Sequence, residues 1–338
     1  MSEPARRSSS LAGILRQRSV LLTAVLWLAC FAAIFPLSHG TLPFNRPALT
    51  DVPFLKQVVQ LLVVLVFVFL FLGVIYLVTR RRTPPDMAAR APDSATAWRE
   101  TLGLLVYGAV VLSLGQLVGR HFGGEGIGLH LNGSLFGPTR TLAPSEVYLW
   151  AAYNFILLAL LPYIVFRMRG YSPAALNLKS SNLKNDTLLI FVVLALESVA
   201  DLSMSGFLGL TPRQMILGGS LSFVVHLFGT GLPVMVFIYC ILMPRYARLS
   251  GSLVTTTLLG AFSYAAIHIF EYWTVYDSPA HSALSLFFVF LTFFSPGLVK
   301  SFLTVRTGNA WVHLWGYHAI APHVTMDTPI IVKIFGIR

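Results

Sequence analysis

The segment from Leu55 to Val78 reads "LKQVVQLLVVLVFVFLFLGVIYLV", and Lys56 is its only charged residue. A helix that crosses the hydrocarbon core of a bilayer needs about 20 mostly apolar residues, so this segment predicts a transmembrane helix. The whole chain has the same character, with 56% apolar residues, 11% charged residues and a mean hydropathy of +0.74. These values lie far from those of soluble proteins and predict a polytopic membrane protein.

Eight further apolar segments resemble the first one. They span about 19–37, 102–118, 148–166, 187–207, 215–243, 253–270, 283–305 and 309–326. We therefore expect an all-α transmembrane helical bundle of about eight or nine spans. It would consist of an N-terminal membrane region (1–147) with three spans and a Gly-rich loop, a helical core (148–326) and a C-terminal tail (327–338).

Clusters of basic residues lie in every second loop between these segments. They are Arg80, Arg81, Arg82 and Arg90, then Arg167, Arg169, Lys179 and Lys184, then Arg245 and Arg248, and finally Arg306. The positive-inside rule places such loops in the cytoplasm, together with the N-terminus, and the intervening loops 38–54, 119–147, 208–214 and 271–282 outside. The net charge of +11 is thus explained by the bilayer, and we expect no nucleic-acid partner.

Carboxylates within a membrane span are costly and need a reason to persist. Glu197 and Asp201 lie four residues apart in "LALESVADLSM" and share one helix face. One interpretation is a carboxyl pair near a wet helix end, hydrogen-bonded to a neighbouring helix. The other is a site for a proton, a metal ion or a substrate.

Two of the histidines inside apolar segments have polar or helix-breaking neighbours. His226 precedes the sequence Gly-Thr-Gly-Leu-Pro, which predicts either an interrupted helix that lines a cavity or a single interhelical hydrogen bond. His268 follows Tyr264 by four residues and precedes Glu271 by three, so we expect all three on one helix face. His268 and Glu271 are candidates for a base and its orienting group, or for two metal ligands, although aromatic crowding at the membrane interface also explains this segment.

Three further histidines, His313, His318 and His323, are spaced by five residues in the last apolar segment. Positions five apart on an α-helix are rotated by about 140°, so the three cannot share one α-helical face. Because Pro322 interrupts the helix, we expect His318 to face the bundle and His323 to lie near the outer rim.

The C-terminal half is similar to the CPBP family of intramembrane proteins, also called the Abi or CAAX-protease-like family. The resemblance covers about residues 165–325 and depends on "RGYSPAALNLK", "ILMPRYARLSGSLVTTTLLGAFSYAAIH" and "VRTGNAWVHLWGYHA". Active members are glutamate-dependent or metal-dependent proteases with the motifs Glu-Glu-x-x-x-Arg, Phe-x-x-x-His and His-x-x-x-Asn. The resemblance implies that His268 and His318 occupy the positions of the two family histidines.

The other family motif positions differ in this chain. The two glutamates fall on Val234 and Met235, the arginine on Tyr239 and the asparagine on Pro322. Valine and methionine cannot activate water. The chain therefore resembles a degenerate member that lacks the family mechanism.

Three functional classes follow. The sequence favours a non-proteolytic membrane scaffold, whose partners are the lipid bilayer and another membrane protein. The second class is an intramembrane metal- or glutamate-dependent hydrolase or protease in which Glu197, Asp201 or Glu271 acts with His268 and His318. Zinc is compatible with these two histidines as ligands, although the family motif does not support it. The third class is a transporter or a cofactor-binding bundle that uses His226 with the same two histidines.

Overall fold

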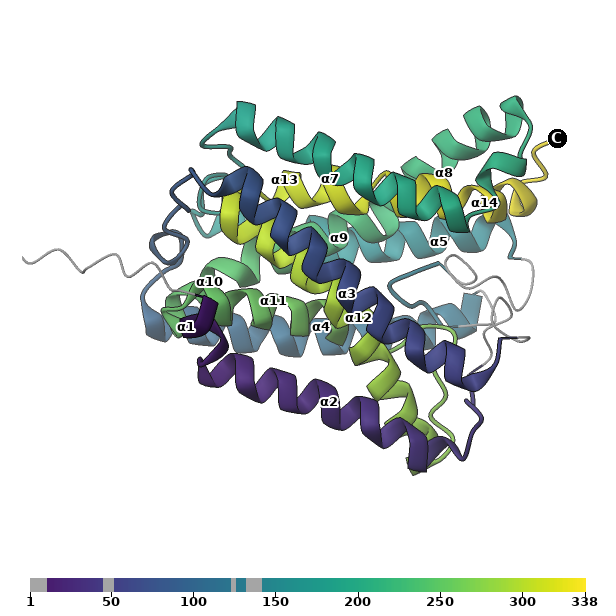
Figure 1. Cartoon of the computed structure of the whole chain (residues 1–338). Helices are drawn as coiled ribbons and strands as arrows, with labels where there is room; N and C mark the ends of the chain where they lie inside the picture. Colours follow the sequence, from purple (N-terminus) through teal and green to yellow (C-terminus); the bar gives the residue numbers. More distant parts are fainter. Residues whose placement is uncertain (1–10, 45–51, 123–125, 132–141) are drawn as a thin grey trace, which may run out of the picture.

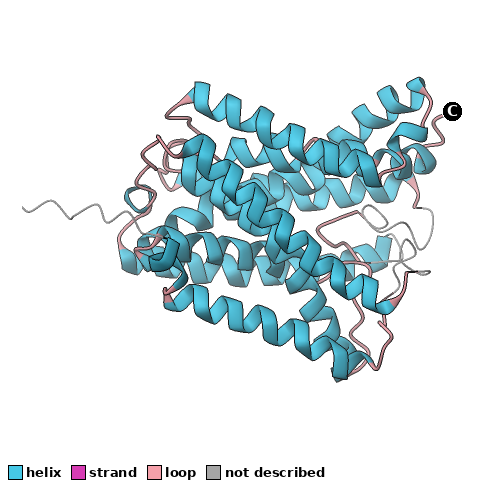
Figure 2. Cartoon of the chain, in the orientation of Figure 1, coloured by secondary structure: helices cyan, strands magenta, loops and turns pink. Residues whose placement is uncertain are grey.

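The computed structural model describes residues 11–44, 52–122, 126–131 and 142–338, so part of the predicted Gly-rich loop lies outside the described residues. Every regular element in these ranges is a helix (Figure 2), which confirms the predicted all-α fold for this part of the chain. The helices are α1 (Leu11–Leu15), α2 (Arg18–Ser38), α3 (Phe54–Thr79), η2 (Ala88–Arg90), α4 (Ser94–Phe122), α5 (Pro144–Asn154), η3 (Phe155–Leu160), α6 (Leu161–Met168), α7 (Leu183–Met204), η4 (Phe207–Gly209), η5 (Gln214–Gly218), α8 (Gly219–His226), η6 (Leu227–Gly231), α9 (Leu232–Val234), η7 (Met235–Leu242), α10 (Met243–Ser250), α11 (Leu253–Ala266), α12 (Pro279–Thr307), α13 (Ala310–His313), η8 (Leu314–His318), η9 (Ala321–Met326) and α14 (Thr328–Ile334).

Six helical segments in the described part of the chain are long and apolar enough to cross a membrane. They are Arg18–Ser38, Phe54–Thr79, Ser94–Phe122, Pro144–Met168, Gln214–Ser250 and Pro279–Thr307. The protein is therefore an integral, multi-pass membrane protein, and these six helices are candidates for six of the expected eight or nine spans. The other three predicted positions are also helical. The predicted segment 253–270 contains α11, which has 14 residues, and the segment 187–207 overlaps α7, which contains three carboxylates. The segment 309–326 consists of α13, η8 and η9.

The six spans differ in how much of their surface packs inside the bundle. Only 17% of the apolar window of α2 and 22% of that of α3 are buried, against 67% for Gln214–Ser250 and 61% for α12. Large apolar side chains of α3, such as Phe69 and Leu70, remain exposed. A continuous apolar surface of this kind suits lipid rather than water. The segment Gln214–Ser250 and α12 therefore form the centre of the bundle, and α2 lies at its edge (Figure 1).

The basic loops meet at one end of the bundle. Arg82 follows α3 and donates a hydrogen bond to the carbonyl oxygen of Thr307 at 2.7 Å. Arg90 donates to the carbonyl oxygen of Gly308 and to the side-chain oxygen of Asn177, each at 2.6 Å. These bonds join the loops that follow α3, α6 and α12. Figure 1 shows α1 and α10 at this end and the C-terminus at the opposite end.

A buried ion pair lies at the same end. Arg245 of α10 is 0% exposed and holds one carboxylate oxygen of Glu100 in α4, with Nε at 2.7 Å and Nη2 at 2.6 Å from Oε2. The other oxygen accepts a hydrogen bond from the Tyr171 hydroxyl and forms an ion pair with Arg169 Nη2, both at 2.8 Å. Two charges removed from water remain stable only when geometry and additional hydrogen bonds compensate for lost hydration, as they do here.

Candidate metal centre

Six of the nine histidines are buried in the bundle. They form one connected set of rings, which we call the histidine cluster: His268 to His130 (4.8 Å between ring centroids), His130 to His323 (6.0 Å), His323 to His226 (4.7 Å), His323 to His318 (5.3 Å) and His318 to His313 (6.3 Å). Imidazole is the commonest metal-binding side chain in proteins, and six such rings in an apolar bundle indicate a functional site.

The last three histidines lie together because the helix becomes π-helical after His313. Both η8 and η9 are π-helical, and the backbone N–H of Ala319 donates to the carbonyl oxygen of Leu314, five residues earlier, at 2.7 Å. In such a turn residues five apart follow one another on the same face. His313, His318 and His323 are therefore all buried, at 0%, 2% and 1% exposed. The prediction that only His318 faces the bundle, with His323 near the rim, is wrong.

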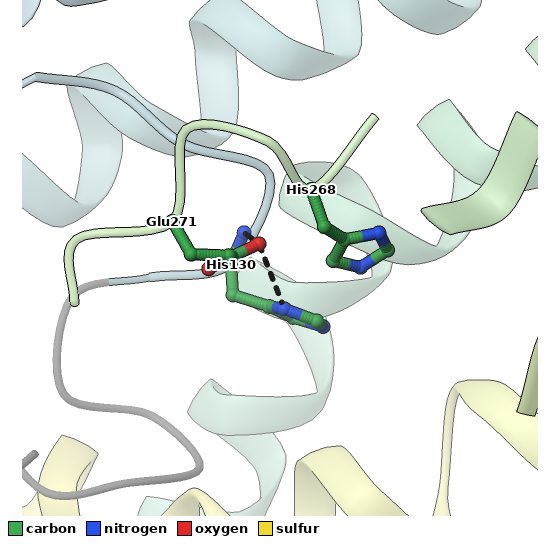
Figure 3. Close-up of side chains that lie close together, drawn as sticks. All are labelled: His130, His268 and Glu271. Atoms are coloured by element: carbon green, nitrogen blue, oxygen red, sulfur yellow. Dashed lines mark hydrogen bonds and ion pairs between the residues drawn. The ribbon is translucent and has the colours of Figure 1, made fainter. Parts of the chain in front are cut away.

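His130, His268 and Glu271 form a first group of potential metal ligands, which we call the first triad (Figure 3). One donor atom from each residue lies within 4.8 Å of the other two, and all three side chains are buried. Glu271 Oε1 lies 3.2 Å from His130 Nδ1 and accepts a hydrogen bond from the His130 backbone N–H at 3.4 Å. His268 and Glu271 do not share one helix face as expected, because α11 ends at Ala266 and a turn carries both side chains toward His130.

His268 has one ring nitrogen fixed and the other available. Its Nδ1 lies 2.5 Å from the carbonyl oxygen of Tyr264, one helical turn earlier. A carbonyl oxygen only accepts hydrogen bonds, so Nδ1 carries a proton, and in the neutral ring Nε2 then carries the lone pair. No described residue forms a hydrogen bond with this buried Nε2. Metal-binding histidines are commonly oriented in this way, with the second nitrogen bonded to a backbone carbonyl.

The loop that carries His130 is held in the bundle by side chains from two other segments. The carbonyl oxygen of Leu129 accepts hydrogen bonds from Trp150 Nε1 at 3.2 Å and from Thr230 Oγ1 at 3.0 Å. Asn154 Nδ2 donates to the carbonyl oxygen of Gly128 at 3.0 Å. A Cβ at Gly128 would lie 2.6 Å from the carbonyl oxygen of Phe270, so glycine permits the close approach to the segment that carries Glu271.

A second group of potential ligands, which we call the second triad, consists of His226, His323 and Asp327. All three side chains are buried, at 0%, 1% and 0% exposed. Asp327 lies in the segment that was predicted as a tail. In the structure it joins η9 to α14, and α14 packs against α8 and η5.

The other predicted site residues surround the two triads. His318 and His268 both contact the Tyr264 ring, at 6.1 and 4.5 Å between centroids. Among the described residues His318 belongs to neither triad. Glu197 and Asp201 lie on α7, which packs against η8 and η9, and they are also outside both triads.

The positions that resemble the family glutamates contribute no donor to this site. Val234 and Met235 are buried in the apolar core, at 0% and 2% exposed. Tyr239, at the arginine position, packs its ring 4.1 Å from that of His313. Pro322, at the asparagine position, lies in the π-helical turn before His323.

The fold and the site define an integral membrane helical bundle with histidines and carboxylates at its centre. Comparison with known protein families, with curated proteins and with solved structures gives no match. The resemblance to the CPBP family therefore stays a prediction from the sequence.

Sequence reasoning did not identify three of the donors, His130, His323 and Asp327. His130 lies in a loop rich in glycine, where no periodicity marks a buried side chain. The five-residue spacing of His318 and His323 is visible in the sequence and fits a π-helix. The four-residue spacing of His323 and Asp327 is also visible and fits two side chains in contact on one helix face.

Proposed function

We propose that this protein is an intramembrane metal-dependent hydrolase whose ion is bound by His130, His268 and Glu271. The observation that carries the proposal is the orientation of His268, whose Nε2 lone pair lies in the bundle beside a second imidazole and a carboxylate. A buried nitrogen without a hydrogen bond costs about 1–3 kcal/mol, and coordination to a cation would offset that cost.

The donor set fits a divalent transition metal. Two histidines and one carboxylate bind the catalytic ion in several zinc hydrolases, with water in the remaining position, and the same set binds iron(II) in oxygenases. Zinc–ligand bonds of about 2.0–2.2 Å place neighbouring ligand atoms roughly 3.3 Å apart. The 3.2 Å between His130 Nδ1 and Glu271 Oε1 already matches that spacing.

The chain offers further groups for hydrolysis beside the first triad. A bound metal ion supplies an activated water molecule. His318 contacts Tyr264 and has both ring nitrogens without hydrogen bonds to described residues, so it is placed to accept or return a proton. Lys300 Nζ donates to the Tyr264 hydroxyl, and the Tyr264 ring in turn packs against His268 at 4.5 Å between centroids.

The proposal selects the second of the three classes that the sequence leaves open. The scaffold interpretation depends on Val234 and Met235, which stand where the family motif has glutamates. Glu271 and Asp327, however, are two other carboxylates that lie among the histidines. The resemblance to the CPBP family supports an intramembrane hydrolase, with the carboxylate function moved to Glu271. A scaffold would need no buried imidazoles with free lone pairs.

Metal content tests the proposal. Full-length protein purified in detergent, stripped with a chelator and dialysed against Zn²⁺, is expected to retain zinc, and Glu271→Gln should lose the ion of the first triad. The neutral amide keeps the size of the side chain but is a weak ligand. His313→Gln is the matched control, because His313 is equally buried but belongs to neither triad. Zinc measured by mass spectrometry at the same level in Glu271→Gln and wild-type protein would overturn the proposal.

We also propose nine membrane passes, with the basic end and the N-terminus in the cytoplasm. The basic loops share one end of the bundle, and α1 and the C-terminus lie at opposite ends (Figure 1), which supports an odd number of passes. The candidate metal centre then lies toward the non-cytoplasmic end, because His130 follows the far end of α4.

Cysteine labelling tests this orientation. Cys30 and Cys240 are first replaced by serine, and a cysteine is then introduced at Ala174 in the loop after α6 or at Ala280 at the start of α12. A membrane-impermeant maleimide added to intact cells is expected to label the Ala280→Cys protein and to leave Ala174→Cys unlabelled until the membrane is opened. The reverse pattern contradicts the proposed orientation, and labelling of both contradicts the topology.

A further inference from the structure

We infer that the second triad is a second metal site, so that the histidine cluster holds two adjoining divalent cations. The inference rests on the proposed function for the first triad and extends it to His226, His323 and Asp327. It depends on three independent observations, namely the orientation of His226, the spacing of the donors and the contact between the two triads.

The orientation of His226 repeats that of His268. Its Nδ1 lies 2.8 Å from the carbonyl oxygen of Ser222, one turn earlier in α8, and must therefore donate to it. The lone pair of Nε2 then faces Asp327 Oδ2 at 3.2 Å. A nitrogen lone pair and a carboxylate oxygen repel each other unless a cation lies between them. His226 at the end of α8 and His268 in the turn after α11 thus both have Nδ1 bonded to a backbone carbonyl and Nε2 free of hydrogen bonds to described residues.

The spacing of the donors in the second triad fits one ion. Asp327 Oδ2 lies 2.8 Å from His323 Nδ1 and 3.2 Å from His226 Nε2. Both values are close to the roughly 3.3 Å between neighbouring ligands of a tetrahedral zinc ion with bonds of about 2.0–2.2 Å. Asp327 Oδ1 is also buried and has no hydrogen-bond partner among the described residues.

Protons alone explain the second triad less well than a cation. The carboxylate of Asp327 lies next to the imidazoles of His226 and His323. Asp201 of α7 and His130 are its further electrostatic neighbours. A protonated His226 would satisfy Asp327 Oδ2, but His323 Nε2 and Asp327 Oδ1 would still lack partners among the described residues. Buried charges and polar atoms that remain unpaired are strongly unfavourable.

The two triads adjoin through His130 and His323, whose ring centroids are 6.0 Å apart. Hydrolases with two adjacent ions use them to bind the attacking and the leaving oxygen of one displacement. Two ions held by these triads would assign a substrate class to the proposed hydrolase, namely an ester or phosphoester with an oxygen leaving group, or an amide with a nitrogen leaving group.

Metal stoichiometry tests the inference separately from the proposed function. Apo-protein dialysed against Zn²⁺ is expected to bind two ions per chain. Asp327→Asn should bind one, Glu271→Gln should bind one, and the double variant should bind none. His313→Gln should bind two. With Mn²⁺ in place of Zn²⁺, wild-type protein should give the electron paramagnetic resonance signal of a coupled pair, and each single variant that of an isolated ion.

The outcomes distinguish the two proposals. One ion in wild-type protein, retained in Asp327→Asn and lost in Glu271→Gln, overturns the second site and leaves the first intact. No bound ion in wild-type protein overturns both. If Asp327→Asn releases both ions, His226→Gln decides the question, because it removes a different ligand of the same site. Release of both ions in that variant as well shows that the second triad is no separate site.

Discussion

Glu271→Gln is expected to reduce hydrolysis of membrane peptides by about 10²-fold or more. A bound metal ion stabilises a hydrolytic transition state by several kcal/mol, and each 1.36 kcal/mol changes the rate about tenfold. Glu271 is the only carboxylate of the first triad, and its Oε1 lies 3.2 Å from His130 Nδ1. The amide removes the negative charge that favours the cation and keeps the shape of the side chain.

The measurement is cleavage of prenylated and unprenylated membrane peptides by purified, zinc-loaded protein in detergent. His318→Ala should also lower the rate if His318 transfers protons, without removing the ions. His313→Gln should cleave at nearly the wild-type rate. Equal rates in Glu271→Gln and wild-type protein contradict the assigned role of Glu271. If wild-type protein binds zinc but cleaves no peptide, peptides are not its substrate, and the scaffold interpretation is favoured again.

Arg245→Met is expected to lower the free energy of unfolding by about 3–5 kcal/mol, because removal of one partner leaves the other charge buried and unpaired. In this variant Glu100 would still contact Arg169 and the Tyr171 hydroxyl. The Arg169 side chain is 49% exposed. Neither replaces the two short contacts from a guanidinium that is 0% exposed. The effect is measured by denaturant unfolding in micelles.

Two further variants show whether the buried pair causes the effect. Arg248→Met removes a neighbouring arginine whose Nε donates to the carbonyl oxygen of Pro92, and its exposed side chain should cost less than about 1 kcal/mol. The double variant Glu100→Leu with Arg245→Met removes both charges and should be more stable than Arg245→Met alone. A loss in Arg245→Met no greater than in Arg248→Met contradicts the prediction.

The membrane class and the positions of the helices could be predicted because they depend on local composition. An apolar run such as 55–78 has no stable alternative to a helix in lipid, since its backbone groups must bond internally. The arrangement of the basic loops could also be predicted, because basic residues cluster in every second loop between the apolar segments. His268 and His318 were recognised because a polar side chain in an apolar segment is visible without knowledge of its partners, and Glu271 because it follows His268 by three residues.

The composition of the candidate centre depends on contacts that the sequence does not display. His130 reaches Glu271 across 141 positions of the chain, through a loop held by Trp150 and Thr230. The burial of His323 depends on π-helical turns, and a helical wheel drawn for an α-helix turns this residue away. Local pattern therefore predicted His226, His268, His318 and Glu271 as candidates, and tertiary packing added His130, His323 and Asp327.

The two ends of the bundle are fastened in different ways in the described part of the chain. Arginines join the loops after α3, α6 and α12 at the basic end, whereas the uncharged side chains of Trp150, Asn154 and Thr230 hold the loop 126–131 at the other end. Local opening follows the segments with the fewest stabilising contacts. We expect amide hydrogens near His130 and Glu271 to exchange with deuterium long before those near Arg90 and Asn177, so that ions and substrates enter while the basic end stays folded.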